Sequence, residues 1–201
     1  MVEPVVDRCE PTSGESPSST TYETWQPVVE KGTVYRLDVE TNCGDLVLRF
    51  DSADAPNTTD ALTFLADRGY FDHTRCHRLT TDGIHVVQCG DPSGDGTGGP
   101  GFGIPDENLP AKGDGGLATY PRGTVAMAEA PGGLPGSQFF IVHQDSPLPP
   151  DYTVVGELTE GLDVIDAVAE AGTADGSADG EPKQALEILQ ARSSATTKVK
   201  S

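Results

Sequence analysis

Glycine and proline occur so often in this chain that few segments are long enough to form a helix. The 201 residues include 24 glycines and 16 prolines, which separate short apolar runs from one another. Proline lacks the backbone N–H group and glycine loses much conformational entropy on ordering, so this spacing favours turns between short strands. The sequence therefore predicts a mainly β fold with many loops.

The clearest strand pattern is a hairpin. Residues 34–39 place apolar side chains at alternate positions, residues 41–44 have the composition of a turn, and residues 46–50 form a second apolar run. This order predicts two antiparallel strands. Apolar runs at 139–142 and 185–189 predict two further strands.

Helical spacing occurs in two segments only. The first begins with Asn57 or Thr58 as its cap and ends at Gly69, and the second covers residues 162–168 and is closed by Gly172. Many strands with two helices predict an antiparallel β-barrel that is closed on itself and covered by the helices at its ends. Closure is favoured because it removes exposed strand edges.

The ends of the chain differ in composition from the middle. Residues 1–33 are rich in Pro, Ser, Thr and Glu and lack periodicity, which predicts a flexible arm or linker in which Trp25 could dock on the domain. The barrel domain is expected at residues 34–192 and a disordered tail at 193–201. No apolar stretch is long enough for a transmembrane helix, and the N-terminus lacks the pattern of a signal peptide, so we expect no membrane insertion.

Charge excludes two classes of partner. The formal net charge is -19, from 32 acidic and 13 basic residues. Nucleic acids and anionic membrane surfaces both require cationic patches on the protein, so neither is an expected partner. The acidity itself is typical of a solvated surface.

The most informative motif is Gly136-Ser137-Gln138-Phe139-Phe140. It places an amide and two aromatic rings where a glycine turn enters an apolar strand, which suits either a site for a small apolar ring or ordinary core packing. Val125-Ala126-Met127-Ala128 lies upstream, and Cys76-His77-Arg78 lies further upstream. In this order the motifs resemble the cyclophilins over about residues 35–191, and Cys-His-Arg-Leu-Thr-Thr with Gln-Cys-Gly-Asp-Pro looks like actinobacterial members of that family.

The resemblance implies an eight-stranded closed barrel and peptidyl-prolyl cis-trans isomerase activity without a cofactor. Rotation about a peptide bond has a barrier of about 18–20 kcal/mol, because the nitrogen lone pair is delocalised into the carbonyl group. In the twisted amide the proline nitrogen regains a lone pair that can accept a hydrogen bond. A fixed cationic donor beside it therefore stabilises the transition state selectively.

The resemblance assigns this donor to Arg78, whose planar guanidinium stays charged and holds its donors in a rigid fork. Gln88 would orient Arg78 or bind the substrate backbone, and Phe140 would hold the proline ring. For Arg78 taken alone, a surface salt bridge is the alternative interpretation. The remaining substrate-binding positions implied by the resemblance are His85, Val86, Gly96, Ala128, Glu129, Gln138, Leu148 and Tyr152.

Several of these positions depart from the usual family residues. His85 stands where an aromatic residue is usual and Glu129 where asparagine is frequent, while the tryptophan that binds cyclosporin falls near Pro147. Thr80-Thr81-Asp82-Gly83 also forms a long turn, so the alignment of His85 and its neighbour Val86 is open by one residue. These departures predict weak cyclosporin binding, and His85 would either make activity depend on pH or act as a neutral spacer.

The sequence is consistent with two functions. The first is an isomerase that acts on proline-containing peptides and unfolded proteins. The alternative is a proline-peptide binding module that has kept the groove but lost useful turnover. Retention of Arg78, Gln88 and Phe140 favours the enzyme, whereas the changes at His85, Glu129 and Pro147 favour the binder. We expect either to act as a monomer.

Other motifs point to different chemistry but lack supporting residues. Residues 94–99 match G-x-G-x-x-G, yet Pro100-Gly101 cannot open the helix that a dinucleotide site needs. Ser137 and His143 suggest a hydrolase, but glycines do not flank Ser137 in the G-x-S-x-G pattern of that class. The four histidines lack the spacing of a zinc site, and no glutamate closes a calcium loop after Asp91, Asp95 and Asp106, so we expect no metal.

The four cysteines at positions 9, 43, 76 and 89 form an even set. Four cysteines allow three disulfide connectivities, and four free thiols are an equal alternative. Together with the linker-like arm they favour an extracytoplasmic domain, secreted or tethered to the envelope, with a cytoplasmic location as the alternative.

Overall fold

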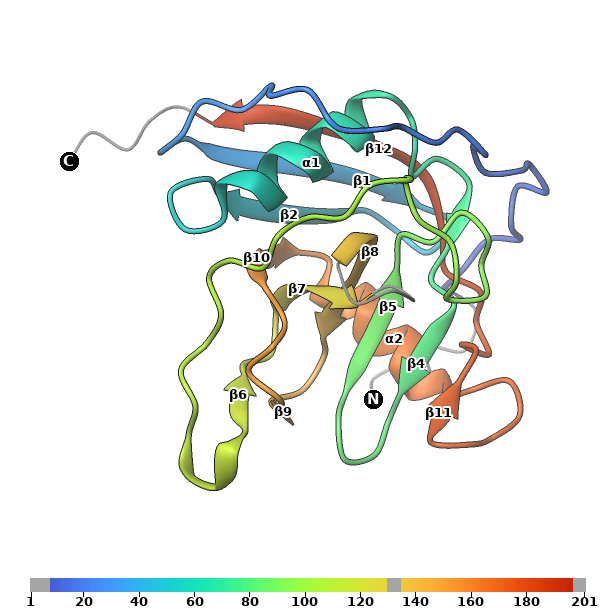
Figure 1. Cartoon of the computed structure of the whole chain (residues 1–201). Helices are drawn as coiled ribbons and strands as arrows, with labels where there is room; N and C mark the ends of the chain where they lie inside the picture. The colour runs from blue at the N-terminus through green and yellow to red at the C-terminus, as the bar shows by residue number, and fades with distance from the viewer. Residues whose placement is uncertain (1–7, 130–134, 197–201) are drawn as a thin grey trace.

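A curled antiparallel sheet of ten strands dominates the computed structural model, which describes residues 8–129 and 135–196 (Figure 1). The strand order is β11-β4-β5-β8-β7-β10-β2-β1-β12-β3, and β6 and β9 form a separate pair. The strands are β1 (Val34–Thr41), β2 (Leu46–Asp51), β3 (Thr74–Arg75), β4 (Arg78–Thr80), β5 (Val86–Cys89), β6 (Ala118–Tyr120), β7 (Thr124–Glu129), β8 (Pro135–Val142), β9 (Ser146–Leu148), β10 (Val154–Glu160), β11 (Asp179–Gly180) and β12 (Glu187–Thr196).

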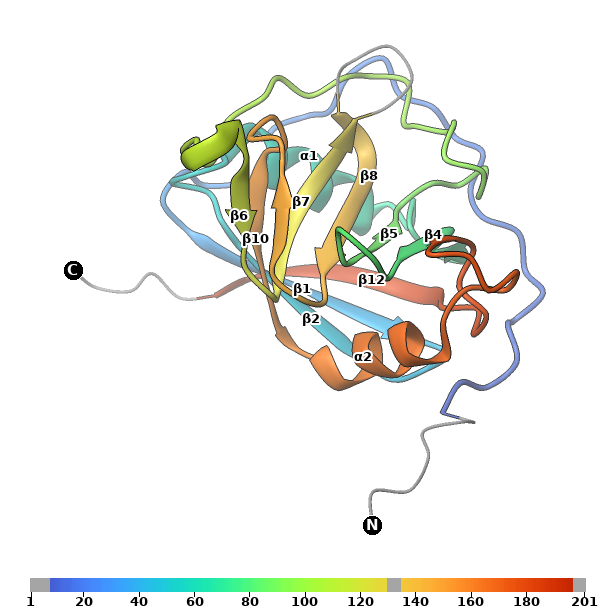
Figure 2. The ribbon, with the colours of Figure 1, turned by 90° about the horizontal axis from the view of Figure 1, so that it is seen from below.

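The two helices, α1 (Pro56–Asp67) and α2 (Leu162–Ala171), lie at opposite ends of the curled sheet (Figures 1 and 2). Both contribute apolar side chains to the one large core, which also takes residues from most strands of the sheet. The prediction of a mainly β fold with two covering helices is therefore confirmed.

The strand count differs from the predicted eight-stranded closed barrel. Residues 74–80 account for part of the difference, because this segment is split at Cys76 and His77 into β3, which pairs with β12, and β4, which pairs with β5. The segment thus joins the two sides of the sheet, and an isolated bridge between Arg75 and Asp91 lies beside it. The short strand β11 adds a further strand at the edge.

The first hairpin forms where the alternation predicts it. In β1 the buried side chains Tyr35, Leu37 and Val39 alternate with more exposed ones, as a strand with one face on a core requires. Leu37 lies opposite Leu48 of β2, which is also buried. The strands run to residues 41 and 51, slightly further than the apolar runs alone indicate.

The start of α1 corrects the predicted cap. The helix begins at Pro56, with Ala55 at the N-cap position and no side-chain capping bond, so neither Asn57 nor Thr58 is the cap. Proline suits the first helical position because its missing N–H group needs no partner there. The helix ends before Gly69, and α2 ends at Gly172, as the sequence predicts.

The arm has no helix or strand over residues 8–33, yet its backbone is bonded to the barrel. Tyr22 donates its N–H to Pro100 O at 2.7 Å, and Val28 and Val29 donate theirs to Asp60 Oδ1. Trp25 packs on Phe102 with ring centroids 5.1 Å apart, which is the docking expected for this residue. Residues 1–7 of the predicted arm lie outside the described residues.

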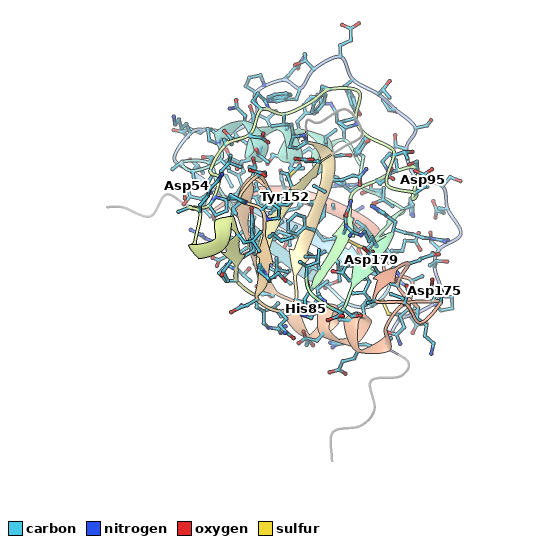
Figure 3. The ribbon with its side chains drawn as sticks, turned by 60° about the horizontal axis from the view of Figure 1, so that its bottom comes forward. Asp54, His85, Asp95, Tyr152, Asp175 and Asp179 are labelled. Carbon is cyan, nitrogen blue, oxygen red and sulfur yellow. A yellow bond between two sulfur atoms is a disulfide. The ribbon has the colours of Figure 1, made fainter. Side chains whose placement is uncertain are left out.

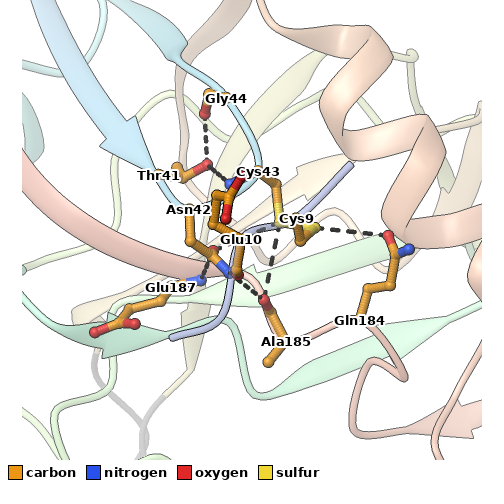
Figure 4. Close-up of a disulfide and its surroundings, with 9 residues drawn as sticks. All are labelled: Cys9, Glu10, Thr41, Asn42, Cys43, Gly44, Gln184, Ala185 and Glu187. Carbon is orange, nitrogen blue, oxygen red and sulfur yellow. Dashed lines mark hydrogen bonds between the residues drawn. A yellow bond between two sulfur atoms is a disulfide. The ribbon is translucent and has the colours of Figure 1, made fainter. Parts of the chain in front are cut away.

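A disulfide between Cys9 and Cys43 fastens the arm to the turn between β1 and β2 (Figure 4). Beside it, Glu10 donates its N–H to Asn42 O at 2.8 Å, and the Asn42 side chain donates to Glu10 O and Ala185 O. Cys76 and Cys89 form a second disulfide, and no described cysteine is free. The structure thereby selects one of the three possible connectivities.

The last strand is longer than predicted. It was expected at residues 185–189, with a tail from 193, whereas β12 continues to Thr196 and pairs with β1 along its length. Residues 197–201 of the predicted tail lie outside the described residues. Within the described residues, no helix is long and apolar enough to cross a membrane.

Candidate active site

A pocket of about 180 Å³ opens where β4, β5, β7, β8 and β9 come together. Most of the site residues predicted from the sequence line it. Those absent from its lining are His85, Gly96 and Gln138, and one unpredicted residue, Ile84, is present. The lining residues are Arg78, Ile84, Val86, Gln88, Ala128, Glu129, Phe140, Leu148 and Tyr152.

The apolar wall of the pocket is a small cluster separate from the barrel core. Phe140 is 5% exposed, and its ring meets the Tyr152 ring edge-on at 5.5 Å between centroids. Tyr120 lies behind both rings, 6.3 Å from each, and its hydroxyl lies 3.0 Å from Pro149 O. Such edge-to-face packing fixes ring positions, so the wall presents a preformed apolar surface.

The polar side of the pocket is a chain of side-chain hydrogen bonds. Arg78 and Gln88 are paired across β4 and β5, and Arg78 Nη1 lies 3.4 Å from Gln88 Oε1. Gln88 Nε2 donates to Gln138 Oε1 at 2.8 Å, and Gln138 Nε2 donates to Gly96 O and Gly98 O, each at 2.9 Å. Gln138 and Gly96 therefore support Gln88 from behind instead of lining the pocket.

Arg78 also has an ion-pair partner that sequence reasoning missed. Asp179 accepts from Arg78 Nε at 2.8 Å and from Nη2 at 2.7 Å. The hydrogen bond to Asp179 raises the pKa of Arg78, and the bond from Arg78 lowers the pKa of Asp179. The predicted alternative for Arg78, a salt bridge, thus coexists with its place in the pocket. No spacing pattern links two residues that are 101 positions apart.

His85 does not line the pocket. In β5, alternate side chains point to opposite faces, so Val86 and Gln88 share the pocket face and His85 lies on the other side. Ile84, one residue earlier, lines the pocket instead. The His85 ring instead packs edge-on against His143, and Figure 3 labels it well away from Tyr152.

Glu129 and Tyr152 bring an acidic and a phenolic group to the pocket. Burial, with a smaller contribution from the Glu129 charge, raises the pKa of Tyr152. Because Tyr152 stays protonated at neutral pH, its hydroxyl can donate a hydrogen bond to a ligand. Glu129 is the last described residue before 130–134, which are outside the described residues.

The glycine-rich loop after β5 is held by one buried carboxylate. Asp91 accepts from Ser93 N at 2.7 Å and from Gly96 N at 2.6 Å. Burial alone would raise the pKa of Asp91, but the hydrogen bond from the Ser93 hydroxyl, together with these backbone bonds, keeps it below its ordinary value. The segment is a loop and opens no helix, as its sequence indicates. No group of three potential metal-ligating side chains occurs among the described residues.

The hydrolase interpretation has no geometric support. The Ser137 hydroxyl is buried and donates to Gly90 O at 2.7 Å, while His143 Nε2 lies 3.0 Å from Thr80 O. Gly90 itself has a φ of 87°, and a Cβ atom there would lie 2.4 Å from Ser137 O. Ser137 is therefore part of the packing between β5 and β8, and it is not a nucleophile.

Comparisons with known proteins agree with this geometry. A family model described as cyclophilin type peptidyl-prolyl cis-trans isomerase/CLD matches residues 36–193. A Mycobacterium tuberculosis protein named probable peptidyl-prolyl cis-trans isomerase B is 44% identical over 162 residues, covering 76% of this chain and 52% of that protein. A Helicobacter pylori peptidyl-prolyl cis-trans isomerase is 36% identical over 155 residues, covering 75% of this chain and 88% of that protein.

Solved structures show the same fold. The crystal structure of a Cryptosporidium parvum cyclophilin type isomerase gives a TM-score of 0.63 at 23% identity, covering 82% of this chain and 99% of that one. The chain spans about half the length of the mycobacterial relatives that it matches. Through the family match, these identities and the shared fold, the chain belongs to the cyclophilin-type peptidyl-prolyl cis-trans isomerase family.

Proposed function

We propose that this chain accelerates cis–trans rotation of X-Pro bonds in peptides and unfolded proteins. One observation carries the proposal: a fixed guanidinium, that of Arg78, borders an apolar pocket whose far wall is Phe140. Phe140, Val86 and Leu148 would take the proline ring, because burial of an apolar ring against apolar side chains is favourable. The proline nitrogen would then lie on the side of the pocket that Arg78 occupies.

The reaction needs no covalent step. As the amide twists, conjugation between nitrogen and carbonyl is lost and the nitrogen lone pair becomes a hydrogen-bond acceptor. A donor from Arg78 would bind this lone pair in the twisted state and find no acceptor there in the planar state, which lowers the barrier. Gln88 would hold Arg78 at the pocket or accept a hydrogen bond from the substrate backbone.

A coupled assay of cis-to-trans conversion on an Ala-Pro peptide tests the function. We expect acceleration by the wild type and, for Arg78→Ala, a loss of about 2–4 kcal/mol of transition-state stabilisation. Absence of acceleration by the folded wild type would refute the enzyme. The Cryptosporidium parvum cyclophilin type isomerase, which has the same fold, was crystallised in the presence of the dipeptide Ala-Pro, and this supports the choice of substrate.

The second candidate is a proline-peptide binding module. Glu129 favours it, because a carboxylate at the pocket departs from the usual family residue. In that case a labelled Ala-Pro peptide would bind the pocket with no acceleration of rotation. Peptide titration together with the rate assay separates the two candidates.

We also propose an extracytoplasmic location and action as a monomer. The pairing of all four cysteines supports the location, because disulfides persist in oxidising compartments. A single chain supplies Arg78, Gln88 and Phe140 to the pocket, so the proposed reaction requires no second copy. Pro147 in place of tryptophan supports weak cyclosporin binding, and a nanomolar dissociation constant by calorimetry would exclude this.

A further inference from the structure

The carboxylate of Asp179 bonds to one edge of the Arg78 guanidinium. A guanidinium has five N–H donors arranged on the two edges of a plane. The Asp179 carboxylate occupies the edge formed by Nε and Nη2, at 2.8 and 2.7 Å. Nη1, which Asp179 does not contact, lies 3.4 Å from Gln88 Oε1, and Gln88 is itself a lining residue of the pocket.

We propose that Asp179 is a positioning residue that clamps Arg78 so that Nη1 faces the proline pocket. The proposal rests on the proposed isomerase function. Ordering an arginine side chain costs rotamer entropy, so a fixed guanidinium needs strong partners. The Gln88 contact, at 3.4 Å, is too long to fix the guanidinium alone. The two short bonds to Asp179 supply the missing restraint before the substrate binds.

The loop between α2 and β12 is built to deliver this carboxylate. Asp179 pairs with Thr80 as part of β11, and Ala178 O accepts the N–H of Thr81 at 2.9 Å. The loop is also held internally, because Asp175 accepts from Ser177 N at 2.9 Å and from Ser177 Oγ at 2.6 Å. Figure 3 shows Asp179 and Asp175 on this loop beside the edge of the sheet that carries β4.

The charge of Asp179 also has an effect on Arg78 that opposes the benefit of orientation. The Asp179 charge partly neutralises Arg78, and removing it would make the guanidinium a stronger electrostatic partner for the twisted amide. Both side chains of the pair are partly exposed, at 40% and 54%, so solvent screens this effect. Orientation depends on bond direction and is not screened. A misplaced catalytic group can cost a hundredfold in rate, so we expect the loss of orientation to dominate.

The chain contains a matched pair for comparison. Arg122 and Asp166 also form a two-bond ion pair, through Nη1 and Nη2 at 2.6 and 2.7 Å, and both side chains are partly exposed. Neither residue lines the proline pocket. Asp166→Asn therefore removes an equivalent surface interaction, and it controls for general effects of losing an arginine–aspartate pair.

The first test does not require turnover. In proton–nitrogen NMR spectra, the Nε–H signal of Arg78, assigned by its loss in Arg78→Lys, should exchange slowly with water because Asp179 holds it. We expect Asp179→Asn to increase this exchange at least about tenfold, in line with loss of a charge-assisted bond, and Asp166→Asn to leave it unchanged. Fast exchange of the Arg78 signal in the wild type would overturn the clamp even if the protein proves inactive as an isomerase.

The second test uses the rate assay. We expect Asp179→Asn to lower kcat about tenfold with KM within twofold, because orientation matters most in the transition state. Asp179→Glu should recover part of the loss, and Asp166→Asn should keep wild-type values. If the wild type is active and Asp179→Asn keeps its kcat, the positioning role is wrong while the proposed function stands. A parallel rise in KM with unchanged kcat would likewise overturn it.

Discussion

Cys76, which lies just before β4, and Cys89, the last residue of β5, form a disulfide beside the polar side of the pocket. Arg78 follows Cys76 by two residues, and Gln88 immediately precedes Cys89, so the bridge lies next to the Arg78–Gln88 pair. Both sulfur atoms belong to buried residues of the main core. The bridge therefore couples the core to the geometry of the site.

Removal of this bridge should affect both stability and activity. For Cys76→Ala with Cys89→Ala we expect a loss of about 3 kcal/mol in the free energy of unfolding, from the closed loop in the unfolded chain. The pairing of Arg78 with Gln88 should also loosen, which lowers kcat/KM. Urea denaturation and the rate assay check these outcomes. A double variant with wild-type kcat/KM would show that the bridge is not needed for the site.

The other disulfide should affect stability alone. Cys9→Ala with Cys43→Ala releases the arm from the turn between β1 and β2, and the longer closed loop predicts a loss of about 4 kcal/mol. Neither cysteine lines the pocket, so kcat/KM at a temperature where the variant is folded should equal that of the wild type. A marked fall in kcat/KM would contradict the separation of arm and site.

Gln138→Leu should disconnect the hydrogen-bond chain behind the pocket. The substitution leaves Gly96 O and Gly98 O without the Gln138 donor, and it leaves Gln88 Nε2 without its acceptor. Because Gln138 is 1% exposed, we expect a loss of about 2 kcal/mol in stability, and a lower kcat/KM as Gln88 shifts. Gln190→Leu, on the exposed face of β12, is the matched control and should change neither quantity.

Acidification below neutral pH should destabilise the fold through two histidines. Burial lowers the pKa values of His77 and His143. At His77 the charges of Asp91 and Asp95 oppose this shift. At His143 the hydrogen bond to the Thr80 carbonyl and the charge of Asp166 oppose it. The nearby cations also lower both values: Arg78 at His77, and Arg122, together with His85, at His143.

A histidine with a lowered pKa binds fewer protons in the folded state than in the unfolded state, where its pKa is about 6.5. Its contribution to stability is therefore complete above about pH 6.5 and falls as the pH decreases through that value. Urea denaturation between pH 5 and 7.5 should show this slope, and His143→Gln should reduce it. An unchanged slope in His143→Gln would assign the effect elsewhere.

Ile84 and His85 should behave in opposite ways. Ile84→Ala removes part of the pocket lining, so we expect a rise in KM for an Ala-Pro peptide. His85→Ala changes a residue on the other face of the strand and should leave KM and kcat unaltered. Activity should also lack a dependence on the charge of His85. A large effect of His85→Ala would show that this strand changes register when substrate binds.

The elements that follow from local patterns were predictable from the sequence. The hairpin of β1 and β2 and the helix α2 depend on which side chains face the core, and this periodicity is visible in a single segment. The pocket residues Arg78, Gln88 and Phe140 were predicted because they lie in motifs whose order along the chain resembles that of the cyclophilins. The cap of α1 was misassigned because Pro56 starts the helix without any side-chain bond.

Other features depend on contacts that no local pattern encodes. The contact between Arg78 and Asp179 arises where the edge strand β11 pairs with β4, which is far away in the sequence. That Ile84 and not His85 lines the pocket depends on how the turn before β5 directs its side chains, which no local pattern specifies. The arm is held by a disulfide, one aromatic contact and individual hydrogen bonds, in a segment whose sequence has no periodicity.

The arm has a consequence for how the chain is made. Ser13 donates its N–H and its hydroxyl to the buried carboxylate of Glu187, at 2.6 and 2.5 Å, across 174 positions of sequence. Because synthesis is directional, at about 5–20 residues per second, the arm leaves the ribosome well before its partner exists. Docking of the arm onto β12 is therefore a late event of biogenesis, which follows release of almost the whole domain.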